Sequence, residues 1–110
     1  MKKRIGIIGA GSFGTALGII LTKKGHQVKI WGRKHSQLEL MRDTLENPHY
    51  LPGVKLPKQL EIVFNKEEVF DHADIVIFSV PAQSFRSVFH EAVEMLERDT
   101  VVVNVAKGIE

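Results

Sequence analysis

Cysteine is absent from this sequence of 110 residues. Without it the chain can form no disulfide framework, no zinc site built on thiolates and no cysteine nucleophile. Disulfides are rare in cytosolic proteins, so the absence is compatible with that compartment, and we expect a cytoplasmic protein. The five histidines show no ligand spacing, and we therefore expect no metal site.

Long apolar runs are also scarce. The uncharged run 5–21, preceded by Met1-Lys2-Lys3-Arg4, superficially resembles a secretory signal. Glycine interrupts this run repeatedly, however, and the run is short for a membrane span, which takes about 20 apolar residues. We therefore expect an unprocessed chain with no membrane span.

Acidic residues are missing from the first third of the chain. Residues 1–38 carry eight Lys or Arg and no acid, whereas residues 39–110 carry seven basic and thirteen acidic side chains. A formal net charge of +2 thus hides a cationic segment, which suggests an anionic partner such as phosphate, nucleic acid or a membrane surface. We expect no nucleic acid, because the cations are spread over two predicted strand ends and a helix terminus.

Short apolar runs alternate with segments of helical spacing. Strands are predicted at 4–8, 28–31, 61–64, 75–80 and 101–105. Helices are predicted at 13–24, 36–45, 65–72 and 81–96. Because the strands are almost wholly apolar, they are expected to be covered on both faces, as in a parallel sheet with helices on either side. The stretch 47–57, with three prolines and a glycine, is expected to be irregular.

Particular residues are predicted to shape these helices. The first helix is expected to bury a stripe of apolar side chains: Phe13, Ala16, Leu17, Ile20 and Leu21. The spacing of Ser36 and Glu39 is that of a capping box at the start of the second helix. Asn65 is the expected cap of the third helix, and Pro81 the first residue of the fourth.

Residues 9–14, Gly-Ala-Gly-Ser-Phe-Gly, match the dinucleotide-binding fingerprint, and a predicted strand precedes them while a helix follows. In this motif Gly9 would make the tight turn, Gly11 would let a pyrophosphate approach, and Gly14 would let the helix pack closely on the strand. The fold class is therefore α/β, a Rossmann-type doubly wound parallel sheet in one domain, 1–110. The alternative is a tight turn without a ligand.

The backbone amides of Ser12 and Phe13 are expected at a helix N-terminus, where partial positive charge favours an anion. At the end of the second predicted strand, NAD sites place an acid that binds the ribose hydroxyl. Here Arg33 and Lys34 stand instead, and both can bind a 2′-phosphate. We predict that NADPH is preferred, with NADH still able to bind. The alternative is that both residues are ordinary surface cations.

Lys107 follows the last predicted strand after one intervening residue. Ligands of open α/β sheets bind at the carboxyl ends of the strands, so this lysine is a candidate for binding a phosphorylated or carbonyl-bearing substrate. A lysine that ends a strand without any such role is an equally good interpretation.

Taken together, these segments resemble the bacterial type of NAD(P)-dependent glycerol-3-phosphate dehydrogenases. The matching segments are 9–17, 31–33, 47–53, 56–57, 80–83 and 107–110. The proline-rich block and the terminal Lys-Gly-Ile-Glu are the most specific of them. Two positions depart from the family pattern, which usually has tryptophan in place of Phe13 and commonly serine in place of Ala82.

The resemblance implies a reaction, hydride transfer between NAD(P)H and dihydroxyacetone phosphate or sn-glycerol 3-phosphate, which feeds glycerophospholipid synthesis. It also implies a set of cofactor-binding residues: Ser12, Phe13, Arg33, Lys34, Tyr50 and Lys107. Lys107 would also reach the substrate. The alternative for Tyr50 is that it packs on Leu51 and stiffens the loop.

Members of that family continue into a helical C-terminal domain, which holds most substrate contacts and the lysine that donates a proton. We therefore expect a truncated chain that contains no catalytic residue and binds NADPH without turnover; a homodimer of the full-length protein stays open. Two alternatives remain: a nucleotide-sensing regulatory module without catalysis, and another NAD(P)-dependent dehydrogenase acting on a 2-hydroxy or keto acid.

Overall fold

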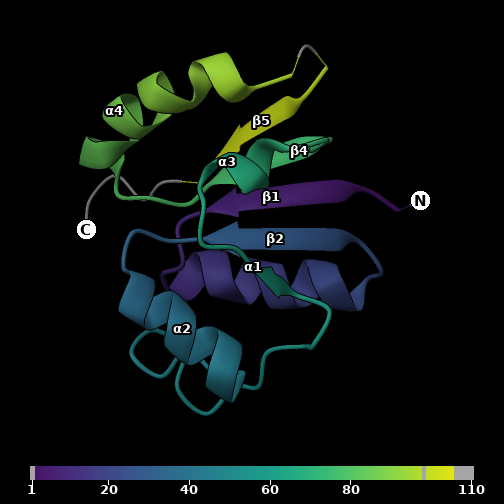
Figure 1. Ribbon diagram of the computed structural model, residues 1–110, viewed down its shortest axis with the longest axis vertical. Coiled ribbons are helices and arrows are strands. Elements are labelled where there is room, and N and C mark those ends of the chain that lie inside the picture. Colours follow the sequence, from purple (N-terminus) through teal and green to yellow (C-terminus); the bar gives the residue numbers. More distant parts are fainter. Residues whose placement is uncertain (1, 98, 106–110) are drawn as a thin grey trace.

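The computed structural model describes residues 2–97 and 99–105. They form a five-stranded parallel sheet with helices on both faces (Figure 1). The strands are β1 (Arg4–Ile8), β2 (Gln27–Trp31), β3 (Glu61–Ile62), β4 (Ile75–Phe78) and β5 (Val101–Asn104). The helices are α1 (Ser12–Lys23), α2 (His35–Thr44), α3 (Glu67–Phe70) and α4 (Ala82–Ala92), followed by a 3-10 turn at Val93–Met95. The predicted α/β class and the alternation of strands with helices are confirmed.

The strand order β3-β2-β1-β4-β5 places β1 at the centre of the sheet. Ile7 of β1 lies beside Ile30 of β2 on one side and beside Ile77 of β4 on the other. The chain first adds β2 and β3 on one side of β1, and then returns to add β4 and β5 on the other side of β1. Such a reversal opens a crevice at the carboxyl ends of the central strands, where open α/β sheets bind ligands.

Two hydrophobic cores lie on opposite faces of the sheet. One joins Ile7 and Ile30 to Leu38 and Met41 of α2, all four fully buried. The other joins β4 to α3 and α4. At its centre Phe78 contacts the rings of Phe85 and Phe89 edge to face. Because side chains alternate along a strand, β1 supplies Ile7 to the first core and Ile8 to the second.

The buried stripe predicted for α1 is only partly right: Leu17 and Leu21 pack against the first core, but the other members do not form a buried face. Phe13 and Ile20 keep 45% and 51% of their surface exposed, and Ala16, Leu17 and Leu21 are only partly buried. The buried residues are instead mostly small: Gly14, Thr15, Gly18, Ile19 and Thr22. Small side chains let the helix axis approach the sheet more closely than a stripe of leucine would. The apolar periodicity therefore identified the helix but only part of the face that it buries.

Three predicted helix starts also differ from the structure. Helix α2 begins at His35 after Lys34, whose carbonyl accepts the Leu38 amide at 3.1 Å, so Ser36 lies inside the helix and forms no capping box. Helix α3 begins after Lys66 rather than after Asn65. Pro81 precedes α4 as its cap, in an extended conformation with a ψ of 145°, so the helix starts at Ala82, one residue after the predicted start.

Strand β5 is not covered on both faces as predicted. Val101 keeps 56% of its surface exposed, and Val102 and Val103 keep 36% each. Within the described part of the chain β5 pairs only with β4, and the aromatic side chains of α4 pack over Phe78 of β4.

No helix in residues 2–97 and 99–105 has the length and apolar character needed to cross a membrane.

Candidate functional site

The glycine-rich loop joins β1 to α1 in a turn with almost no free space. Gly9 has a φ of +117°, and a Cβ there would overlap the carbonyl oxygen of Ser79. A Cβ on Gly14 would in turn overlap the carbonyl oxygen of Gly9. The Gly9 amide donates to the Trp31 carbonyl at 2.7 Å, which ties the turn to the end of β2. These two positions are therefore closed to any larger residue.

Gly11 has different surroundings. A Cβ at this position would meet no atom within 4 Å, so the space above the loop is open. Gly11 is also the N-cap of α1 and supplies no side chain to its first amides, and the first turn contains no acid. The positive end of the helix dipole thus faces an open space at the surface. Such an arrangement suits an anion.

A cleft of about 250 Å³ connects this loop with the end of β2. Gly9, Gly11, Arg33, Lys34 and Tyr50 all line it. Arg33 and Lys34 are exposed, and neither forms an ion pair with another described residue. Two uncompensated cations and a helix N-terminus therefore border one cleft at the carboxyl edge of the sheet.

Tyr50 reaches the glycine loop although it is far away in sequence. The Ser12 hydroxyl donates a hydrogen bond to the Tyr50 carbonyl at 2.7 Å, and the Tyr50 side chain keeps 40% of its surface exposed. Phe13 lies at the start of α1 and lines, with Ser12 and Tyr50, a hollow that adjoins the cleft. The structure thus brings Ser12, Phe13, Arg33, Lys34 and Tyr50 together; Lys107 lies outside the described residues.

Three polar residues beneath the loop escaped the sequence reasoning. Thr15 and Asn47 are fully buried and Gln37 is half-buried. They join the carbonyl of Ala10 in one hydrogen-bond network. Asn47 lies in the proline-rich block that carries the resemblance, which was the only available signal for it. Spacing does not indicate that these side chains meet.

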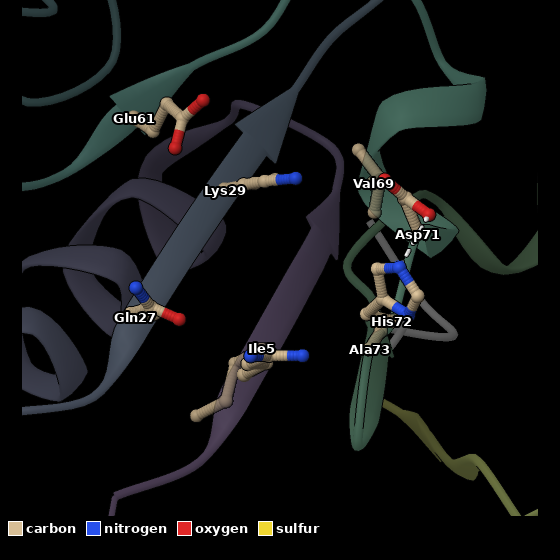
Figure 2. Close-up of a pocket in the computed structure, with 9 residues that line it drawn as sticks. Ile5, Gln27, Lys29, Glu61, Val69, Asp71, His72 and Ala73 are labelled. Atoms are coloured by element: carbon tan, nitrogen blue, oxygen red, sulfur yellow. Dashed lines mark ion pairs between the residues drawn. The ribbon is translucent and has the colours of Figure 1, made fainter.

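A second cleft, of about 230 Å³, lies at the opposite, amino ends of the strands (Figure 2). Its lining mixes cations such as Lys29 with the carboxylates of Glu61 and Asp71. There His72 Nε2 is 3.6 Å from Asp71 Oδ1. Asp71, His72 and Glu97 each have an atom that could bind a metal ion, and these three atoms lie within 4.8 Å of one another, but all three residues are exposed. The charges that line this second cleft are of mixed sign, and the N-terminus of α1 lies at the other edge of the sheet. This cleft is therefore less suited to phosphate than the cleft beside the glycine loop.

Two shifts in pKa occur at the end of α2. The Arg42 guanidinium donates to Asp43 at 2.8 Å, and this hydrogen bond raises the pKa of Arg42 and lowers the pKa of the Asp43 carboxyl. Neither residue lines either cleft.

Comparison with known proteins gives consistent results. The family model described as NAD-dependent glycerol-3-phosphate dehydrogenase N-terminus matches residues 4–110. The chain is 42% identical to a glycerol-3-phosphate dehydrogenase [NAD(P)+] of Pelotomaculum thermopropionicum. The aligned region covers 100% of this chain but 32% of that relative. A relative of the same name from Agathobacter rectalis is 40% identical, with 97% and 32% covered. The chain thus spans about a third of the length of these relatives.

Solved structures agree on the fold. A glycerol-3-phosphate dehydrogenase from Coxiella burnetii superposes with a TM-score of 0.91 at 28% identity, over 97% of this chain and 33% of that one. A second, from Plasmodium falciparum, superposes with a TM-score of 0.84 at 26% identity, over 97% and 33%.

The two loop glycines make a matched pair of substitutions. We expect Gly14→Ala to lower the free energy of unfolding by about 1–3 kcal/mol, because the new methyl group overlaps backbone. Gly11→Ala should change it by less than about 0.5 kcal/mol, since the site is open and the φ of −79° suits alanine. Urea unfolding followed by circular dichroism measures both, and equal midpoints would contradict the close packing described for the loop.

Proposed function

Since this chain belongs to the family of NAD-dependent glycerol-3-phosphate dehydrogenases, whose N-terminal model it matches over residues 4–110, we propose that it is the dinucleotide-binding part of such an enzyme. The complete enzyme would interconvert dihydroxyacetone phosphate and sn-glycerol 3-phosphate and supply glycerophospholipid synthesis. The bound coenzyme, NAD(P)H, supplies the hydride.

One observation carries the assignment of the coenzyme site. The space above Gly11 is open, while the positions on either side of it, Gly9 and Gly14, are filled by backbone. A pyrophosphate placed there would face the uncapped amides of α1, which compensate its charge. The loop thus combines the access and the polarity that a dinucleotide needs. Ser12, Phe13 and Tyr50 line the adjoining hollow and would contact the rest of the coenzyme.

The preference for NADPH rests on the end of β2. A carboxylate at this place would repel a 2′-phosphate, whereas Arg33 can bind two of its oxygens at once and Lys34 adds a second positive charge. Both side chains line the cleft and are exposed, so a phosphate can reach them. We propose that these two residues hold the 2′-phosphate and that NADH, lacking this group, binds more weakly.

Lys107 remains a proposal based on its position in the sequence. It follows β5, whose carboxyl end lies at the same edge of the sheet as that of β1, because all the strands are parallel. A cation at this edge would contact the coenzyme and the phosphate of the substrate. The proton that accompanies hydride transfer would come from a residue beyond position 110, in the remaining two-thirds of a full-length enzyme.

Arg33 provides the test of coenzyme preference. We expect Arg33→Ala to weaken NADPH binding by about tenfold to a hundredfold, the effect of losing hydrogen bonds to a charged group, and to leave NADH binding unchanged. Isothermal titration of both coenzymes measures this, with Lys58→Ala as a control, because Lys58 is an exposed cation outside the cleft. Equal affinities for the two coenzymes, together with a harmless Arg33→Ala, would refute the preference.

Gly11→Ala provides the test of the pyrophosphate site. The variant should fold normally yet bind NADPH at least about tenfold more weakly, since its methyl group occupies space that the pyrophosphate needs. Titration of the folded variant measures the loss. If NADPH bound this variant as tightly as the wild type, the coenzyme would have to lie elsewhere.

The isolated chain should bind coenzyme without catalysing the reaction. We expect no loss of NADPH absorbance when dihydroxyacetone phosphate is added to the 110-residue protein, because the proton donor is proposed to lie beyond it. A sustained, protein-dependent loss of absorbance would show that the chain contains the whole catalytic machinery.

A further inference from the structure

A buried amide side chain supports the glycine loop from below. Asn47 is fully buried, and its Nδ2 donates to the carbonyl of Ala10 at 2.9 Å and to Thr15 Oγ1 at 2.8 Å. Its Oδ1 accepts a hydrogen bond from Gln37 Nε2 at 3.2 Å. Both hydrogens of the Asn47 amide are therefore used, and its oxygen is satisfied as well.

The carbonyl of Ala10 is the centre of this network. It accepts hydrogen bonds from Gln37 Nε2 at 2.7 Å and from Asn47 Nδ2 at 2.9 Å. Because the peptide between Ala10 and Gly11 is trans and planar, its N–H points away from its C=O. Two donors that hold the oxygen toward the protein therefore turn the Gly11 N–H to the opposite side, and the space around a Cβ on Gly11 is open.

We propose that Asn47 and Gln37 are positioning residues for the coenzyme: they fix the Ala10–Gly11 peptide so that its N–H faces the pyrophosphate. This inference rests on the proposed function. Glycine tolerates many backbone conformations, so this peptide has little intrinsic reason to keep one orientation. A rotation by half a turn would place the Ala10 carbonyl oxygen in the anion site, where it would repel phosphate.

Asn47 also links the loop to Tyr50. Its backbone carbonyl accepts the amides of Tyr50 at 3.1 Å and Leu51 at 2.7 Å, which closes the turn that carries Tyr50. The Tyr50 carbonyl in turn accepts the hydrogen bond from Ser12. One residue thus sets both the orientation of a loop amide and the position of the aromatic side chain across the cleft.

Asn47→Asp is the sharpest variant, because it keeps the shape and removes the donors. An ionised carboxylate only accepts hydrogen bonds, so the bond to the Ala10 carbonyl is lost, whereas the Thr15 hydroxyl can turn to donate to the carboxylate. We expect NADPH binding to weaken by about tenfold to a hundredfold. Adenosine 2′-monophosphate lacks the pyrophosphate and should bind this variant as it binds the wild type. The matched control is Asn65→Asp, the same change at an exposed asparagine.

The pH dependence adds a readout that separates the hydrogen bond from the shape of the side chain. When protonated, the introduced carboxyl can donate one hydrogen bond to the Ala10 carbonyl. The defect of Asn47→Asp relative to wild type should therefore grow as pH rises and the carboxyl loses its proton; burial raises the pKa of such a carboxyl above its ordinary value.

Gln37→Met covers the case in which Asn47→Asp does not fold. Gln37 is half-buried on α2, and methionine keeps its length while removing the donor to Ala10. We expect NADPH binding to weaken by about tenfold, with Gln59→Met, an exposed position, as the control. Circular dichroism establishes that each variant is folded before titration.

The outcomes separate the two proposals. If the wild type binds no NADPH, the proposed function fails and the inference fails with it. If the wild type binds and both folded variants bind NADPH as tightly, the positioning role is refuted while the proposed function stands. A parallel loss of NADPH and adenosine 2′-monophosphate would also refute it, because the damage would then extend beyond the pyrophosphate site.

Discussion

The whole arrangement depends on the contact of backbone with backbone where β1 turns into α1. Gly9 and Gly14 leave no room for a side chain, so the first turn of the helix lies directly against the end of the central strand. This closeness places the positive end of α1 at the carboxyl edge of the sheet, beside the end of β2. A looser turn would move the helix amides away from Arg33 and Lys34, and the cleft would lose its concentration of positive charge.

The sequence was sufficient for the strands, their alternation with helices and the tight glycine turn, because each depends on local composition. It misjudged part of the face of α1, where Thr15 and Gly18 are buried and Phe13 and Ile20 are exposed. Hydrophobic periodicity identifies the apolar face of a helix, whereas close packing of a helix on a sheet needs small residues. The capping box at Ser36 failed for a related reason: the cap is a backbone contact of Lys34, and side-chain spacing does not report it.

The candidate site divides along the same line. The position of Arg33 and Lys34 beside the glycine loop was predictable, since the strand that follows the fingerprint pairs with the first strand and ends at the same edge of the sheet. Tyr50 came from the resemblance alone, and the structure brings it to Ser12 through a turn that local sequence does not specify. Asn47, Gln37 and Thr15 meet only in three dimensions, so no spacing rule connects them. Buried polar networks of this kind are invisible until the chain is folded.

The exposed valines of β5 affect the tendency of the protein to associate in solution. In Val101–Val103 this strand presents apolar side chains and no charge, and among the described strands only β4 pairs with it. Natural sheets guard edge strands with lysine, proline or a bulge, and none of these occurs in Val101–Asn104. An apolar edge strand of this kind favours pairing with a further strand, so association of this chain is expected to increase with its concentration.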